Sequence, residues 1–184
     1  MKKEGKPRED MASWESSEVR FAINEYDDIF SDFDPRPLPL KGFSEDFLEE
    51  AKRACIVKEE NMDFIFMMPK AERNLKEEAR IENRLKQYFK KHLVILEKEK
   101  KQVIKKGLSF TIVGVILMFA ATYLFFKFQN ASFAASFFTI MLEPASWFLF
   151  WEGLDLVIFE AKKVEPNLDF HRKMANAKIK FTSA

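Results

Sequence analysis

The sequence predicts a two-span membrane protein: a helical hairpin of two transmembrane helices, joined by a long juxtamembrane helix to a small cytoplasmic α+β domain. Three observations lead to this fold class. Residues 108–126 contain no charged side chain, residues 133–151 are similarly rich in Phe, Leu, Ala and Trp, and residues 1–106 are densely charged. A charge-free run of this length is typical of a helix that crosses the hydrocarbon core of a bilayer. The overall composition, 47% hydrophobic and 32% charged, hides this partition.

The orientation follows from the basic residues beside the two apolar runs. Lysines crowd the entry to the first run and follow the second, whereas the segment between them carries only Lys127. The positive-inside rule therefore predicts cytoplasmic termini and an external turn at 129–132. We expect a multi-pass protein of the cell inner (plasma) membrane that contacts the lipid bilayer and anionic lipid head groups. A buried core hairpin of a soluble protein is the alternative, but such helices rarely need so long a charge-free run.

The N-terminal third divides into a tail and a folded region. Residues 1–18 are polar and lack hydrophobic periodicity, which predicts a disordered tail. Residues 19–69 predict a cytoplasmic α+β region, with strand patterns at 19–23 and 62–68 and a helix that begins after Ser44. The apolar face of that helix comprises Phe47, Leu48, Ala51 and Cys55.

The cytoplasmic C-terminal segment, 159–184, contains a third strand candidate at 177–181. Because both termini are predicted on one side of the membrane, this strand can pair with residues 62–68. Three short strands with one or two helices are about the least that folds without a partner. The pattern therefore favours one small layered domain built from both ends of the chain.

Residues 70–106 predict a charged helix, free of Gly and Pro until Gly107, that runs directly into a first span at 107–128. The second span is expected at 133–158. The apolar stripe of the charged helix consists of Ile81, Leu85, Tyr88, His92 and Ile95, widened by Phe89, Leu93 and Leu96. This stripe either packs on the small sheet or forms a homo-oligomeric coiled coil. We interpret His92 as a packed or interfacial side chain rather than a metal ligand, because the only other histidine, His171, lies far along the sequence.

The second span carries an acid and a proline near its middle, Glu143 and Pro144. An ionised carboxylate there costs at least about 2.5 kcal/mol, so we expect a neutral Glu143 that donates a hydrogen bond across the helix interface. Thr111 is the nearest polar group in depth if the hairpin is antiparallel. Gly114 would let the two helices approach closely at that level. These four residues form the predicted intramembrane polar site.

A second group of charges lies at the predicted cytoplasmic edge of the membrane. Glu152 and Asp155 are three residues apart and share one helix face. We expect them to meet the lysines of 98–106, which include Lys105 and Lys106.

Residues 25–40 contain the acidic segment, which ends in three prolines. Its aspartates are Asp27, Asp28, Asp32 and Asp34. A divalent-cation site is one interpretation, but the EF-hand spacing is absent. We therefore predict no metal, and expect the aromatic residues to anchor this segment while the aspartates cap turns or pair with the basic helix.

The predicted spans contain no His or Cys and no nucleophile with a base, and Cys55 is the single cysteine of the chain. We therefore predict no catalytic residues, no enzyme activity and no cofactor. The expected function is a membrane-anchored interaction or signalling module that forms a homo-oligomer or docks a protein partner on the cytoplasmic face. An oligomeric ion or proton pathway that uses Glu143 is the alternative. The lysines adjoin an anionic leaflet, so no nucleic-acid partner is needed to explain them.

Four segments carry a resemblance to a known family. In order they read YDDIFSDFDPRP, FLEEAKRA, LEPASWFLFWEGLD and FHRKMANAKIKF. Together they resemble an uncharacterised family of prokaryotic two-span membrane proteins, over most of residues 18–181. The resemblance implies architecture and a prokaryotic membrane, and it implies no chemistry.

Overall fold

The computed structural model describes residues 18–56, 62–128 and 133–183, and it divides the chain into two compact units. The first, called the sheet unit, comprises residues up to 93 and from 169 onward. The second, called the helix unit, comprises residues 94–168. The predicted tail up to residue 17 and the predicted turn at 129–132 lie outside the described residues.

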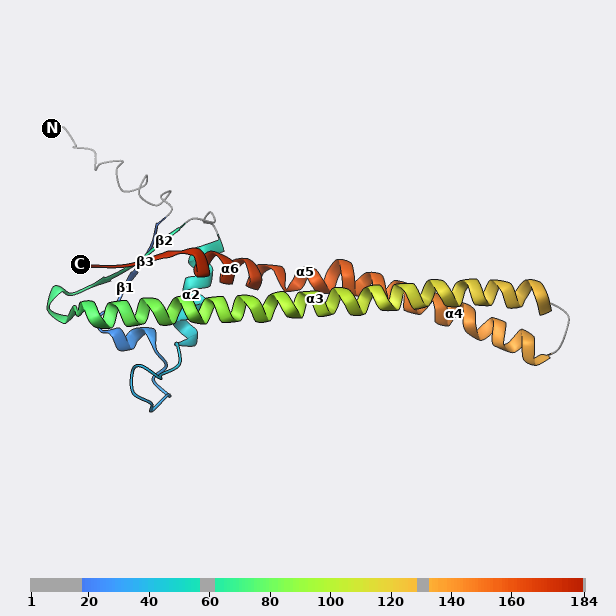
Figure 1. The fold of residues 1–184 in the computed structure, drawn as a ribbon, viewed down its shortest axis with the longest axis horizontal. Coiled ribbons are helices and arrows are strands. Elements are labelled where there is room, and N and C mark those ends of the chain that lie inside the picture. The colour runs from blue at the N-terminus through green and yellow to red at the C-terminus, as the bar shows by residue number, and fades with distance from the viewer. Residues whose placement is uncertain (1–17, 57–61, 129–132, 184) are drawn as a thin grey trace, which may run out of the picture. The chain divides into compact units, whose positions relative to one another are not determined.

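The sheet unit contains three parallel strands in the order β1-β2-β3, labelled in Figure 1. They are β1 (Glu18–Ala22), β2 (Asp63–Met68) and β3 (Lys178–Ser183). Phe64 of the central strand pairs in register with Val19 on one side and Ile179 on the other. The three predicted strands, and the pairing of the C-terminal strand with the middle one, are confirmed to within two residues at each end.

Helices cover one face of this sheet. Alternation along β2 places Phe64, Phe66 and Met68 on that face and Asp63, Ile65 and Met67 on the other, where Ile65 is also buried. Helix α2 (Glu45–Ile56) buries the apolar face predicted for it, and the Phe47 ring meets the Phe64 and Phe66 rings edge-on or tilted. Larger buried side chains complete the core; they are Ile29, Phe30, Met62, Met68, Ile81, Leu85, Phe89 and Met174. On the opposite face Lys180 pairs with Asp63.

Helix α3 runs without a break from Leu75 to Phe128 and belongs to both units. The prediction that a charged helix continues directly into the first apolar run is confirmed, but its predicted start at residue 70 is wrong. Lys70–Glu72 forms a separate 3-10 turn, and the α-helix starts after Asn74. The side-chain oxygen of Asn74 accepts the Lys76 N–H at 3.0 Å, which is the N-cap arrangement.

The stripe on α3 packs as the first interpretation expected, but only over its N-terminal half. Ile81, Leu85 and Phe89 are fully buried in the sheet-unit core. Further along, Val94 and Ile95 are about half exposed. The coiled-coil hypothesis therefore applies to the part of the stripe that the chain itself leaves uncovered, and it stays a prediction.

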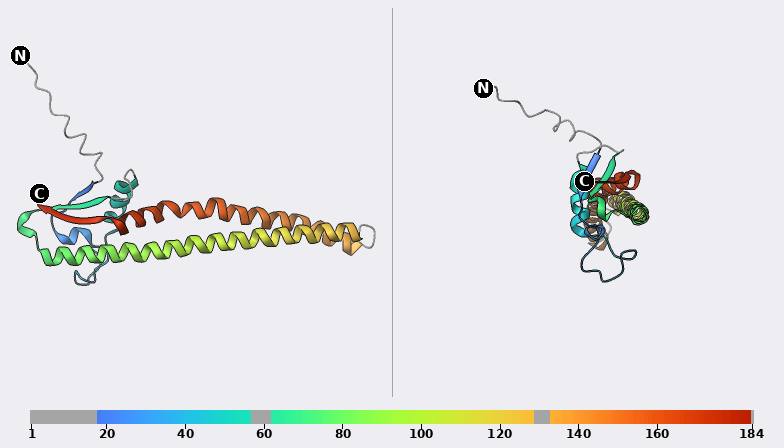
Figure 2. Two further views of the ribbon diagram at one scale, coloured as in Figure 1. Left: turned by 45° about the horizontal axis from the view of Figure 1, so that its top comes forward. Right: turned by 90° about the vertical axis from the view of Figure 1, so that its left-hand side faces the viewer.

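The chain returns through helices, which the sequence analysis had not assigned in the segment after residue 158. Helix α4 (Phe133–Asp155) continues into the π-helical turn η4 (Leu156–Glu160), the short α5 (Ala161–Lys163) and α6 (Glu165–Asn176). Helix α6 was not predicted; its Phe170 packs edge-on against Phe89 with ring centroids 5.5 Å apart. The left view of Figure 2 shows the red C-terminal helix leading directly into β3. The helix unit is therefore inserted between β2 and β3, two strands that pair.

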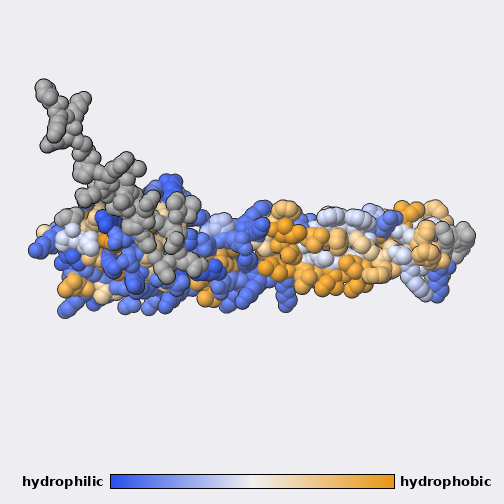
Figure 3. Space-filling model, turned by 90° about the horizontal axis from the view of Figure 1, so that it is seen from above, coloured by the Kyte–Doolittle hydropathy of each residue, from blue (hydrophilic) through white to orange (hydrophobic). Residues whose placement is uncertain are grey.

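Of the described helices, α3 is long and apolar enough to cross a membrane, and only 11% of its apolar window is buried. Apolar residues gather along α3 and α4 in Figure 3. The most exposed large ones include Ile116, Phe119, Phe126, Phe133, Ile140 and Phe148. The helix unit therefore has a large apolar outer surface, and exposing such a surface to water is unfavourable.

Candidate functional site: a cavity beside Glu143

Small residues hold α3 and α4 together at intervals of seven. A Cβ atom at Gly107 would lie 2.7 Å from the carbonyl oxygen of Gly153, and one at Gly114 would lie 2.7 Å from the amide nitrogen of Phe150 and 2.9 Å from the carbonyl oxygen of Ser146. Any side chain there would overlap backbone, so glycine permits the close approach. Ala121 repeats the spacing on α3 and is 7% exposed. These contacts fix the antiparallel register of the pair.

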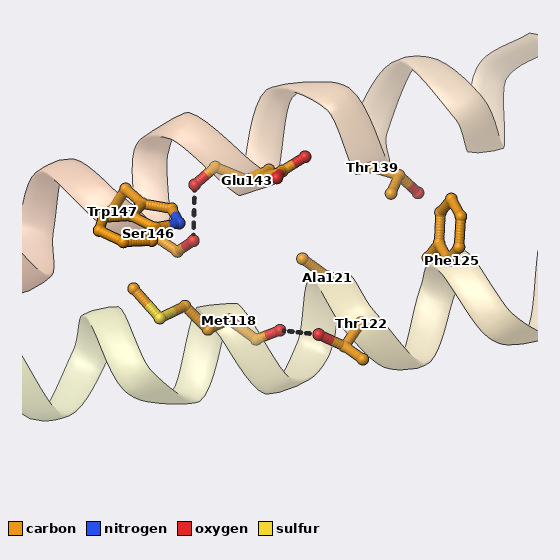
Figure 4. Close-up of a pocket in the computed structure, with 8 residues that line it drawn as sticks. All are labelled: Met118, Ala121, Thr122, Phe125, Thr139, Glu143, Ser146 and Trp147. Atoms are coloured by element: carbon orange, nitrogen blue, oxygen red, sulfur yellow. Dashed lines mark hydrogen bonds between the residues drawn. The ribbon is translucent and has the colours of Figure 1, made fainter.

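Beyond this close approach the two helices enclose an open cavity of about 530 Å³. Pro144 lies inside α4 at this level, where a proline removes one backbone hydrogen bond and bends a helix. The lining side chains, drawn in Figure 4, are Met118, Ala121, Thr122, Phe125, Thr139, Glu143, Ser146 and Trp147. The cavity combines an apolar wall with hydroxyl groups and one carboxyl group.

Two hydroxyl groups of the cavity already use their hydrogen atoms on backbone carbonyls. Thr122 Oγ1 donates to the Met118 oxygen at 2.8 Å, and Ser146 Oγ donates to the Glu143 oxygen at 2.7 Å. Figure 4 shows both bonds. A hydroxyl has one hydrogen and two lone pairs, so what Thr122 and Ser146 offer to the cavity is acceptor capacity.

The carboxyl group of Glu143 makes no hydrogen bond or ion pair with another described residue, and its side chain is exposed. The predicted cross-helix hydrogen bond is therefore not found among the described residues. Thr111, its expected neighbour in depth, donates to the Gly107 oxygen at 3.0 Å and packs against Gly153. The expected register of the two helices was wrong because it was estimated from the predicted ends of the spans. In the structure the contacts at Gly107, Gly114 and Gly153 determine the register.

The predicted charge cluster at the membrane edge is arranged differently from the expectation. Within the described residues Lys100 forms an ion pair across the helices, with Glu165 at 2.7 Å. Lys106 lies over the Phe110 ring, with its nitrogen 5.7 Å from the centroid. Within the described residues neither Glu152 nor Asp155 pairs with a lysine of 98–106, Lys105 included. Both acids instead line a shallow groove of about 330 Å³ on α4 and η4, beside Trp151 and Phe159.

In the acidic segment, three aspartates stabilise the local loop rather than converge on one point. Asp28 accepts the N–H groups of Asn24 and Glu25, and Asp27 pairs with Lys41 at 2.7 Å. Asp34 accepts the Gly42 N–H and the Arg36 guanidinium, which holds the pKa of its carboxyl well below the usual range. Asp32 is exposed. The interpretation that these side chains cap turns fits Asp28 and Asp34, whereas the partner of Asp27 lies in the same loop and not in the basic helix.

The aromatic residues of this segment do not all anchor it. Phe30 is buried and stacks on Phe43, and the Arg84 guanidinium lies 4.8 Å from the Phe30 centroid while donating to the Leu38 and Lys41 carbonyls. Phe33, which was expected to anchor, is 98% exposed. The loop is therefore fixed in shape and holds one large apolar side chain in solvent.

The two histidines, which the sequence separates widely, lie together in the sheet unit. Their ring centroids are 5.7 Å apart in a stacked arrangement. His92 Nδ1 lies 2.9 Å from the Tyr88 carbonyl oxygen, which can only accept, so Nδ1 carries a proton. The structure agrees with a packed His92, but the reason given for it was wrong, since α6 brings His171 alongside. No three His, Cys, Asp or Glu side chains of the described ranges are grouped as a metal site would require.

Sequence reasoning missed Ser146, Thr139 and Met118 as cavity residues. A usable signal was present: Gly107, Gly114 and Ala121 on one run, and Thr139, Ser146 and Gly153 on the other, repeat every seven residues. Small residues with this spacing mark one helix face, and pairing the two faces gives the observed register.

The fold and site together define a mostly helical protein with one long apolar helix and a small three-stranded sheet. Searches with protein-family models, with curated proteins and with solved structures returned no match for the chain. The resemblance to a prokaryotic two-span family therefore stays a prediction.

Proposed function

We propose that this chain is an integral membrane protein of the inner membrane whose helix unit crosses the bilayer twice. The sheet unit is held on the cytoplasmic face, where it acts as an interaction or signalling module that oligomerises or docks a partner. The observation that carries the proposal is the insertion of an apolar helix pair between β2 and β3, two strands that pair with each other.

The strand pairing supports an even number of crossings. If the apolar part of α3 crosses the bilayer, β3 can reach β2 only when the chain crosses back before residue 178. Helix α4 is the segment available for the return, because its apolar side chains, such as Phe133 at 88% exposed and Ile140 at 70%, are suited to lipid. A single crossing would separate the two strands by a bilayer.

The lysines support the orientation. Lys98, Lys101, Lys105 and Lys106 precede the apolar part of α3 and are exposed, as are Lys162 and Lys163 after α4. At the inner surface each such charge gains roughly 1 kcal/mol from anionic lipid head groups. The same side chains at the outer surface would violate the positive-inside rule.

Cysteine accessibility tests the topology directly. Burial raises the pKa of the Cys55 thiol to about 12, so the native cysteine reacts little with maleimides. Labelling of a single introduced cysteine can therefore be measured above a low background. In intact cells a membrane-impermeant maleimide should label Gln129→Cys, and should label Arg80→Cys and Asn176→Cys only after the membrane is opened. Labelling of Asn176→Cys in intact cells would exclude the two-span topology.

The rigid loop around Phe33 supports the docking part of the proposal. An apolar side chain that is 98% exposed on a loop fixed by Arg84, Asp27 and Asp34 loses little conformational entropy on binding. Cross-linking and co-purification of wild type and Phe33→Ala from native membranes test it. The Ala variant should lose a partner, or its self-association, while remaining folded.

The second candidate is an oligomeric ion or proton pathway through Glu143. It is favoured by one observation, a carboxyl group that no described residue pairs with on a membrane helix. Ion and proton flux into liposomes, measured for wild type and Glu143→Gln, separates the candidates. If wild type conducts ions or protons and Glu143→Gln does not, the pathway candidate replaces the module proposal.

A further inference from the structure

The cavity between α3 and α4 is selective in its chemistry. Thr122 and Ser146 present lone pairs to it, because their hydrogens are bonded to the carbonyls of Met118 and Glu143. The Glu143 carboxyl group lies at its edge without a partner among the described residues, as Figure 4 shows. The Trp147 indole, 51% exposed, and the Phe125 ring, 47% exposed, line it as well.

We propose that this cavity binds a protonated organic amine, with the Glu143 carboxylate as counter-ion and the apolar wall around the carbon skeleton. The proposal rests on the proposed function, because it takes the helix unit to lie in the bilayer. An ammonium group carries donors and no acceptor, so it complements the lone pairs of Thr122 and Ser146. The face of an aromatic ring such as Trp147 attracts the same charge.

Other occupants fit less well. A hydrocarbon chain would leave the carboxyl group and the hydroxyl lone pairs unmatched in an apolar medium. An anion would be repelled by Glu143. A bare divalent cation takes about six or more oxygen ligands, and the cavity of about 530 Å³ has the size typical of small-molecule sites.

The membrane strengthens the preference for a cation. No Lys, Arg or His lines the cavity, so within the described residues nothing compensates an ionised Glu143. In a medium of low dielectric constant an unpaired carboxylate is costly and a carboxylate–ammonium pair is strongly attractive. A protonated amine therefore supplies the positive charge that the described lining lacks.

Trp147 supplies the readout. The protein is prepared with Trp14→Phe and Trp151→Phe, so that Trp147 is the remaining tryptophan, and is placed in phosphatidylcholine nanodiscs. Its fluorescence is titrated at neutral pH with cyclohexylmethylamine, which is protonated, and with the neutral alcohol of the same shape, cyclohexylmethanol. The amine should give a saturable change and the alcohol a linear one from membrane partitioning.

Variants identify the charge as the cause. Glu143→Asp should keep saturable amine binding, Glu143→Gln should weaken it at least about tenfold, and Glu152→Gln, an acid outside the cavity, should leave it unchanged. Equal binding by wild type and Glu143→Gln, or alcohol binding as tight as amine binding, would overturn the proposal. Equal loss in the Asp and Gln variants would also overturn it, since charge would then not be responsible.

The topology experiment keeps the two proposals separate. If cysteine labelling excludes two crossings while amine binding persists, the proposed membrane arrangement fails and the cavity chemistry stands. If labelling agrees with two crossings and the amine binds without dependence on Glu143, the reverse holds.

Discussion

The sheet unit and the helix unit are stabilised in opposite ways. In the sheet unit large side chains fill the space between the elements: Phe64, Phe66 and Phe89 are all completely buried. In the helix unit the large side chains point outward and the helices touch through Gly107, Gly114 and Gly153. Water drives apolar side chains together, whereas lipid does not, so helices in a bilayer gain from close backbone packing. This difference in packing is what we expect if water surrounds the sheet unit and lipid surrounds the helix unit.

The largest expected effect tests the sheet unit. Phe64→Ala should cost about 3–5 kcal/mol, because it leaves a cavity between α2 and the sheet. Phe33→Ala is the matched control; its ring is 98% exposed and the change should cost little. Hydrogen exchange in nanodiscs should show loss of protection in β1–β3 and retained protection in residues 108–126. Equal loss in both would mean that the two units unfold together.

The second prediction tests the helix unit in the opposite direction, by adding volume. Gly114→Leu places a side chain against the backbone of Phe150 and Ser146 and should destabilise the helix pair by about 3 kcal/mol. Val113→Leu, one residue away on the exposed side, is the control. Unfolding in mixed detergent micelles measures both. A neutral Gly114→Leu would show that backbone contact does not hold the pair.

The third prediction concerns a polar cluster of the sheet unit. Arg73 bonds Glu78 at 2.8 Å and the Phe181 carbonyl at 3.0 Å, and the Tyr26 hydroxyl joins Glu78 at 3.2 Å. The hydrogen bond from Arg73 lowers the pKa of Glu78. A carboxyl group with a lowered folded pKa stabilises the fold above its unfolded pKa, and this contribution is lost as the pH falls through the folded value.

Glu78→Gln should therefore reduce stability at pH 7 by about 1.5–2 kcal/mol and flatten the loss of stability below about pH 4.5. The neighbouring Glu77→Gln, whose partner Arg80 is largely exposed, should do neither. Chemical denaturation from pH 7 to pH 3 gives both curves. Parallel curves for wild type and Glu78→Gln would contradict the assignment.

The smallest expected effect is at Glu143. Since its carboxyl group bonds no described residue, neither Glu143→Leu nor Glu143→Gln should reduce the stability of the helix pair by more than about 0.5 kcal/mol. This reverses the expectation from sequence, in which Leu would remove a cross-helix hydrogen bond. Thermal unfolding in detergent decides it, and a clear loss for Leu that Gln restores would support the original cross-helix bond, within the chain or between copies.

The sequence by itself determined the elements that local pattern controls. The three strands, the apolar face of α2 and the continuity of α3 follow from residue alternation, helical periodicity and the absence of Gly and Pro between residues 70 and 106. These features depend on neighbours within a few residues, so the pattern contains the information. Helix α6 was not predicted, because its apolar face is short and is interrupted by charged residues.

The tertiary structure alone decided which distant side chains of the helices meet. It placed His171 against His92, gave Lys100 rather than Lys105 or Lys106 an ion-pair partner across the helices, and left Glu143 beside a cavity instead of bonded to Thr111. Each of these depends on the register between two helices, and a shift of one turn moves a side chain by about 5.4 Å. For α3 and α4 the register is set by backbone contacts at Gly107, Gly114 and Gly153. The sequence contains these residues as a repeat, but the repeat alone does not say which glycine faces which.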